Sequence, residues 1–142
     1  MSTSTAEAAW EGGVKGKGTF RAASGAFSAD YSVPTRFEGK PGTNPEELIA
    51  AAHAACLSMA LALALEKAGT PATRITTKAD CTIDRVGDGF RITTMRLQVR
   101  GVVPGIDAAT FNRAAEGAKQ GCPVSNALVN NVKLELDARL ES

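Results

Sequence analysis

The chain has 142 residues, of which 44% are hydrophobic, and its 16 basic and 15 acidic residues leave a formal net charge of +1. This length fits one domain with a core of its own, and we expect residues 1–142 to form a single domain. The balanced charge indicates neither a nucleic acid nor a membrane surface as partner. The first ten residues lack the basic start and apolar stretch of a secretory signal, so we expect a cytoplasmic protein.

Short strands are predicted in the first thirty residues. Between Trp10 and Asp30 the sequence alternates and is rich in glycine, a pattern typical of small strands joined by tight turns. The following segment, YSVPTRFEGKPGTNP at 31–45, contains several Pro and Gly residues and is interpreted as a loop.

A long helix is predicted after this loop. Asn44 can cap it, and Pro45 suits its first position because no N–H is needed there. Gly69 and Pro71 follow Lys67 and mark its end. The helix should therefore run for about 24 residues, or about 36 Å.

The middle of this helix is apolar on every side, since the eighteen positions from Leu48 to Leu65 include only His53 and Ser58 as polar residues. It is long enough to span a bilayer, but it lacks an aromatic belt and a flanking basic cluster. We therefore expect a helix buried in protein. Burying so long a helix on all sides demands more protein than one small domain offers, which predicts a homodimer with the helix at its centre.

The rest of the chain alternates strands and helices. Two β-branched runs at 73–84 and 90–103, joined by RVGDG, predict a hairpin. A helix should run from Asp107 to Gly121, a shorter one should open at Pro123, and 132–140 should form the last strand. Most of these connections are hairpins, so we predict an α+β fold with an antiparallel sheet rather than a parallel βαβ fold.

Cys56, Cys81 and Cys122 are an odd number of cysteines with no export signal, which argues against a structural disulfide framework. None lies in a CxxC pair, and the single histidine makes a zinc site a poor interpretation. We expect neither a metal nor an organic cofactor. Cys81 alternates with apolar residues of a strand and is interpreted as an inert core thiol.

Cys56 and Cys122 are the candidates for thiol chemistry. Cys56 lies in the apolar helix, where it is either a packing residue or a reactive thiol. Burial raises a thiol pKa, so a reactive Cys56 needs a cation nearby. Cys122 precedes Pro123 at a helix cap, where the helix dipole favours a thiolate, and we expect it to be accessible.

His53 lies three residues before Cys56 on the same helix face. A Cys and His hydrolase pair is conceivable, but a satisfied buried histidine is the preferred interpretation. Glu46 lies ten residues before Cys56, about 15 Å along the helix. Any action of Glu46 on Cys56 would therefore require another chain or an intermediary group.

The segments TRFEGKPGTNPEELIAAAHAACLSMAL and GCPVSNAL together resemble the osmotically inducible protein C family and its relatives, the organic hydroperoxide resistance proteins. The resemblance runs from Trp10 to the final strand. TRFEG and PGID favour the osmotically inducible branch.

This resemblance implies an intertwined homodimer in which antiparallel sheets wrap around two long central helices. It also implies a thiol-dependent peroxidase that reduces organic hydroperoxides to alcohols. Cys56 matches the cysteine that attacks the peroxide and becomes a sulfenic acid. Cys122 matches the resolving cysteine that then forms an intramolecular disulfide with it.

The resemblance further assigns Arg36 to favour the thiolate and bind the peroxide, and Glu46 to orient Arg36. It implies an external dithiol reductant of the dihydrolipoamide type. A different class of function stays open: a non-catalytic dimeric module that binds an apolar ligand, with the cysteines as mere lining.

Overall fold

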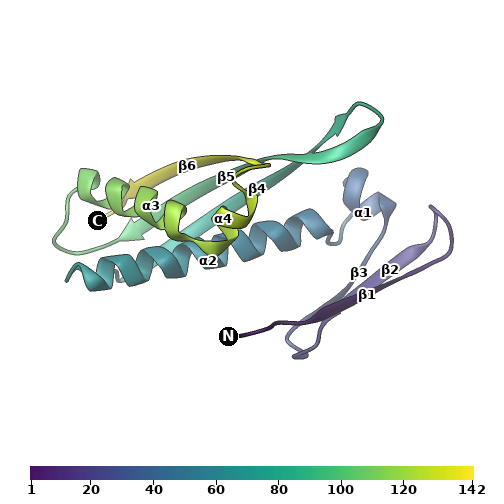
Figure 1. The fold of residues 1–142 in the computed structure, drawn as a ribbon, viewed down its shortest axis with the longest axis horizontal. Helices are drawn as coiled ribbons and strands as arrows, with labels where there is room; N and C mark the ends of the chain where they lie inside the picture. The colour runs from purple at the N-terminus through teal and green to yellow at the C-terminus, as the bar shows by residue number, and fades with distance from the viewer. The chain divides into compact units, whose positions relative to one another are not determined.

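The computed structural model describes residues 1–142, which form six strands and four helices. The chain divides into two units, Met1–Leu48 and Ile49–Ser142. Each unit contains a three-stranded sheet, and the strands are drawn and labelled in Figure 1. The predicted α+β class is confirmed.

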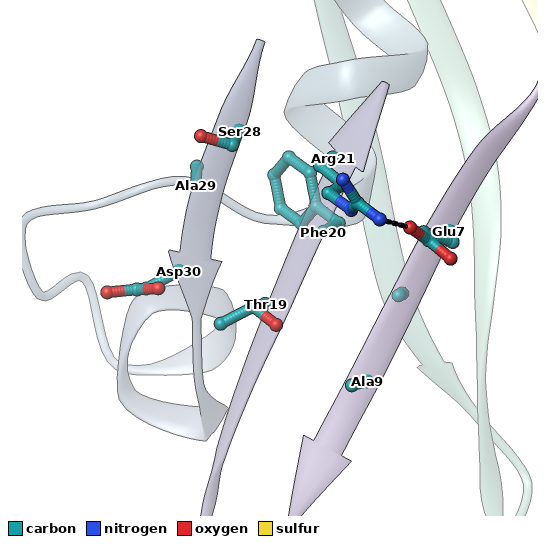
Figure 2. Close-up of a pocket in the computed structure, with 9 residues that line it drawn as sticks. Glu7, Ala9, Thr19, Phe20, Arg21, Ser28, Ala29 and Asp30 are labelled. Atoms are coloured by element: carbon teal, nitrogen blue, oxygen red, sulfur yellow. Dashed lines mark ion pairs between the residues drawn. The ribbon is translucent and has the colours of Figure 1, made fainter. Parts of the chain in front are cut away.

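The first unit is built on a meander of β1 (Ala6–Glu11), β2 (Lys17–Ala22) and β3 (Ser28–Tyr31), all antiparallel. On one face the rings of Trp10 and Tyr31 pack 5.6 Å apart between centroids. Figure 2 shows Arg21 of β2 reaching Glu7 of β1, with which it forms an ion pair. The short strands expected before residue 31 are therefore present.

Helix α1 (Val33–Phe37) lies in the segment predicted as a loop. Ser32 caps it: the Ser32 hydroxyl accepts from the Thr35 N–H, and the Thr35 hydroxyl accepts from the Ser32 N–H. This reciprocal capping box stabilises even a single helical turn. The loop prediction was wrong because Pro34 fits the first turn of a helix as well as it fits a loop.

Helix α2 (Pro45–Lys67) ends where the sequence predicts. The Asn44 side chain accepts from the Glu47 N–H at 2.8 Å, and Gly69 takes a positive φ of 80° after the last turn. By length and composition α2 is the one helix that could cross a membrane, a criterion that the core helix of a soluble protein also meets. Within one chain only 28% of its apolar window is buried.

The sheet of the second unit contains β4 (Arg74–Val86), β5 (Gly89–Val102) and β6 (Lys133–Leu140). The predicted hairpin is confirmed, since β4 and β5 are antiparallel and joined at Gly87, whose φ is 60°. However, β6 pairs with β5 in parallel, so the expectation of purely antiparallel sheets was wrong for this pair. The two helices between β5 and β6 return the chain to the start of β5, as a parallel crossover requires.

These two helices are α3 (Ala108–Gly121) and α4 (Pro123–Leu128). The Asp107 carboxylate caps α3 by accepting from the Thr110 N–H at 2.8 Å. Helix α3 packs on β6, and its Phe111 lies against Gly101 of β5, where a Cβ would come within 2.4 Å of the ring. The buried hydrophobic core comprises Leu57, Leu61, Leu65, Met95, Leu97, Val99, Val103, Phe111, Ala115, Ala118, Cys122 and Val132.

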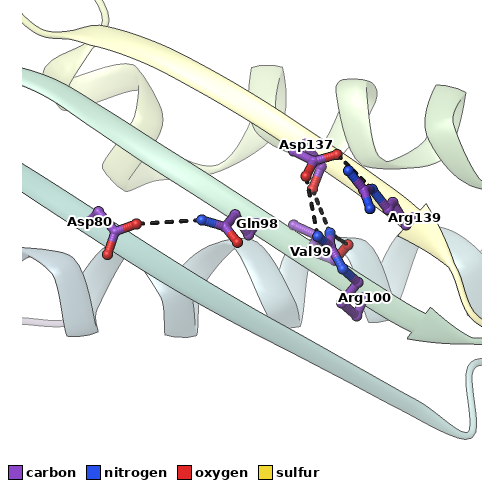
Figure 3. A network of polar contacts seen from close by, with 6 residues as sticks. All are labelled: Asp80, Gln98, Val99, Arg100, Asp137 and Arg139. Carbon is purple, nitrogen blue, oxygen red and sulfur yellow. Dashed lines mark hydrogen bonds and ion pairs between the residues drawn. The ribbon is translucent and has the colours of Figure 1, made fainter.

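Polar contacts tie β6 to β5 (Figure 3). Arg100 of β5 donates to the backbone carbonyl of Asp137 at 3.0 Å and to its carboxylate at 3.1 Å. Arg139 donates to the same carboxylate at 3.3 Å. Asp137 accepts from two arginines, and these hydrogen bonds, that of Arg100 above all, lower the pKa of its carboxyl group.

Candidate active site

Two cysteines that are distant in sequence meet in the second unit. Cys56 lies on α2, and Cys122 lies between α3 and α4, where it ends one helix and begins the next. Their Sγ atoms are 2.8 Å apart although the residues are 66 positions apart. A disulfide bond is about 2.05 Å long, so the two sulfurs need only a small approach to join. The two residues therefore form a dithiol pair.

The two thiols differ in exposure. Cys122 is completely buried, whereas Cys56 is partly exposed. The expectation that Cys122 is accessible was wrong, because the junction of α3 and α4 packs into the core. An oxidant arriving from solvent therefore meets Cys56 first.

The surroundings shift the pKa values of the two thiols in opposite directions. Burial raises the pKa of Cys56, and the hydrogen bond with Cys122 adds to this shift. Burial also acts to raise the pKa of Cys122, but hydrogen bonds with Cys56 and with the N–H and hydroxyl groups of Ser125 outweigh it, so this pKa is lowered. A reactive thiolate at Cys56 needs a further cation.

His53 does not pair with Cys56. It is fully buried, and its Nε2 lies 2.7 Å from the hydroxyl oxygen of Ser125, which is itself buried. Its other ring nitrogen, Nδ1, is buried without a hydrogen-bond partner. Burial lowers the pKa of His53. The interpretation as a buried, hydrogen-bonded histidine is confirmed for one of the two nitrogens, and the hydrolase pair is absent.

In the first unit Arg36 and Glu46 form a bidentate ion pair. Arg36 donates from Nη2 to Glu46 Oε1 at 2.6 Å and from Nε to both carboxylate oxygens at 3.1 and 3.2 Å. The Glu46 side chain is only 6% exposed, whereas that of Arg36 is 34% exposed. The guanidinium also lies over the ring of Phe37, 5.1 Å from its centroid. Glu46 thus holds the Nε and Nη2 edge of the guanidinium, and the N–H groups of Nη1 stay available to another group.

Two further residues complete the description of the site: Cys81, which the sequence predicted to be inert, and Ser125, which the sequence did not single out. Cys81 of β4 pairs with Met95 of β5 and packs against the core, as predicted. Ser125 was missed. The only signal for it was its position three residues after Cys122, one turn along a helix that Cys122 begins. No three side chains of the types that ligate metals are grouped together.

A dithiol pair held by helices against a mixed sheet defines the class of thiol redox proteins. The chain belongs to the OsmC-like protein family, whose model matches residues 37–137. It is 51% identical to "Peroxiredoxin OsmC" of Escherichia coli (strain K12) over 138 residues, or 96% of this chain and 95% of that protein. The resemblance inferred from the motifs is confirmed, and this relative supports the osmotically inducible branch.

More distant relatives belong to the same group of proteins. The chain is 33% identical to the "Organic hydroperoxide resistance protein" of Xanthomonas axonopodis pv. citri (strain 306), covering 93% of this chain and 92% of that protein. A crystal structure of an organic hydroperoxide resistance protein from Elizabethkingia anophelis matches with a TM-score of 0.79 and 26% identity over 99% of both chains. These names support a peroxidase-type function.

Proposed function

We propose that this chain is a thiol-dependent peroxidase that reduces organic hydroperoxides to alcohols. The observation that carries the proposal is the 2.8 Å separation of two sulfurs of which one is partly exposed and the other buried. An exposed thiol can react with a peroxide, and an adjacent buried thiol can trap the product. The names of the relatives from Escherichia coli and Xanthomonas support the same chemistry.

In the first step the Cys56 thiolate attacks the terminal oxygen of the hydroperoxide. An S–O bond forms as the O–O bond breaks, and the alkoxide leaves and takes a proton to become the alcohol. Cys56 is then a sulfenic acid. In the second step the Cys122 thiolate attacks the Cys56 sulfur, an S–S bond forms, and hydroxide leaves and is protonated to water. An external dithiol, for which we propose a lipoyl group, returns both cysteines to thiols.

Arg36 has the role of the cation that Cys56 needs. Lowering a thiol pKa from about 8.5 to about 6.5 requires about 2.7 kcal/mol of preference for the charged form. A hydrogen bond to a charged group contributes about 1.5–3 kcal/mol, so one arginine suffices. The Glu46 carboxylate accepts from Nε and Nη2 of Arg36 and so fixes the direction of the guanidinium, while Nη1 is left to bind a peroxide oxygen.

The working form is a homodimer in the cytoplasm. On α2 the side chains of Met59 and Leu63 are 72% and 49% exposed in one chain. Exposing large apolar side chains together on one helix to water is unfavourable and marks an interaction surface. A second copy of α2 would cover them. Apolar surroundings also favour an alkyl hydroperoxide over hydrogen peroxide, since each buried methylene contributes about 0.8 kcal/mol.

Peptide mapping by mass spectrometry tests the proposal. Fully reduced protein is treated with one equivalent of cumene hydroperoxide or with an equal dose of hydrogen peroxide. We expect a Cys56 to Cys122 linkage that forms faster with the organic peroxide. If both cysteines stay reduced in folded protein, the chain is instead a binding module for an apolar ligand.

A further inference from the structure

Two contacts join α2 to the start of α4, and they are arranged with the same spacing on both helices. Cys56 contacts Cys122, and His53, three residues earlier on α2, hydrogen-bonds to Ser125, three residues later on α4. Residues three apart lie on the same helix face one turn away. The hydrogen bond therefore runs beside the thiol pair and connects the same two segments.

The unpartnered Nδ1 of His53 indicates where the ring proton is. A buried N–H without an acceptor is rare and destabilising, so a proton on Nδ1 is disfavoured. A doubly protonated ring would leave the same N–H unpaired. We therefore assign a neutral ring with its proton on Nε2, which donates to Ser125 Oγ.

This assignment sets the direction of the next hydrogen bond. With its oxygen already accepting from His53, the Ser125 hydroxyl keeps its own hydrogen to donate. The N–H and hydroxyl of Ser125 favour a thiolate at Cys122. A charged sulfur accepts such hydrogen bonds more strongly than a neutral thiol does, so these two donors stabilise the thiolate more than the thiol.

We propose that His53 and Ser125 are a positioning pair for disulfide formation: their hydrogen bond holds the start of α4 against α2 and directs the Ser125 hydroxyl at the Cys122 sulfur. The inference rests on the proposed peroxidase function, of which it specifies the second step. Cys122 loses its proton, its thiolate attacks the Cys56 sulfenic sulfur, and the hydroxide released from that sulfur combines with a proton to give water. The pair does not touch the peroxide, so the first step does not depend on it.

The test separates the two steps in Ser125→Ala. After one equivalent of cumene hydroperoxide, rapid quenching with dimedone and mass spectrometry follow the sulfenic acid at Cys56 and the disulfide with time. We expect oxidation of Cys56 at the wild-type rate and condensation with Cys122 slowed by about tenfold, the scale of one lost hydrogen bond. Ser125→Thr, which keeps the hydroxyl, should restore condensation. His53→Leu should slow it, and His53→Gln, which keeps an N–H donor, should restore most of it.

Ser58→Ala is the matched control. Ser58 lies on α2 two residues from Cys56, and its hydroxyl bonds to that of Thr77 on β4 at 2.7 Å. Its loss should leave both steps unchanged. Condensation at the wild-type rate in Ser125→Ala, or equal slowing in Ser58→Ala, would overturn the positioning role.

A second oxidant separates this inference from the proposed function. Diamide joins thiols without peroxide chemistry, so the rate at which it forms the Cys56 to Cys122 disulfide should also fall in Ser125→Ala. If wild-type protein ignores the hydroperoxide but forms the disulfide with diamide, the peroxidase proposal fails. The comparison of Ser125→Ala with wild type under diamide then still decides the role of the pair.

Discussion

Cys122 is fully buried although its sulfur lies only 2.8 Å from that of Cys56, which is partly exposed. This asymmetry assigns an order to the two thiols. An oxidant can approach Cys56, and Cys122 can react only with what Cys56 becomes. Exposure, rather than thiol pKa, accounts for this order in the isolated chain, because the pKa of Cys56 is raised and that of Cys122 is lowered, which by itself would favour a thiolate at Cys122.

Serine variants test this order. Cys56→Ser should abolish turnover of an organic hydroperoxide, because no other thiol replaces it. Cys122→Ser should release one equivalent of alcohol per chain quickly and then turn over far more slowly than wild type, because the sulfenic acid has no protein thiol beside it and must react directly with the external dithiol. Alcohol released per chain in the presence of a dithiol measures both. Cys81→Ser is the control and should turn over like wild type; turnover at the wild-type rate in Cys56→Ser or Cys122→Ser would rule out the two-cysteine mechanism.

Removing the guanidinium tests Arg36. Arg36→Ala should slow the oxidation of Cys56 by about ten- to a thousandfold, each tenfold being about 1.4 kcal/mol of transition-state stabilisation. Arg36→Lys should recover only part of the rate, because an ammonium group cannot keep the bidentate contact with Glu46. Stopped-flow measurement of the single-turnover rate compares the variants.

Arg21→Ala provides the control for Arg36→Ala. Arg21 also pairs with a glutamate in the first unit, Glu7, but both side chains are more than 60% exposed. Exposed ion pairs contribute little, so this variant should react at the wild-type rate. An equal rate in Arg36→Ala and Arg21→Ala would remove Arg36 from the site.

Local signals in the sequence predicted the long helix well. Asn44, Pro45 and Gly69 determine where α2 begins and ends, and the structure shows the cap and the positive φ they require. The family motifs pointed to Cys56 and Cys122, and the structure brings their sulfurs together. Helix α1 was missed because its capping box lies among Pro and Gly residues that also suit a loop.

Long-range relationships were beyond the sequence. The parallel pairing of β6 with β5 depends on where α3 and α4 return the chain, which alternation within a strand does not specify. Burial of Cys122 depends on the packing of the helix junction, which its sequence neighbours Gly121 and Pro123 do not indicate, since both also suit an exposed turn. The contact of His53 with Ser125 joins residues 72 positions apart, and neither residue signals the other.

The apolar face of α2 predicts a dimer in solution. Leu63→Glu should weaken it, because a charge at an apolar interface is costly to bury. Light scattering at micromolar concentration should give a dimer mass for wild type and a lower mass for Leu63→Glu. Val129→Glu, a similar change at a position that is 52% exposed on the second unit, should remain dimeric. A monomeric wild type would contradict the homodimer.

His53 predicts a dependence of stability on pH. It is the only histidine, and burial lowers its pKa, so the unfolded chain binds a proton more readily than the folded one. The stability that the neutral His53 ring contributes is fully present above the unfolded pKa of about 6.5. It is lost as the pH falls from there toward the lowered pKa of the folded chain. Urea midpoints from about pH 8 to pH 5 should therefore fall more steeply for wild type than for His53→Gln, which has no group titrating in this range. Parallel curves would show that His53 keeps its ordinary pKa, and would remove the neutral ring on which its hydrogen bond to Ser125 was assigned.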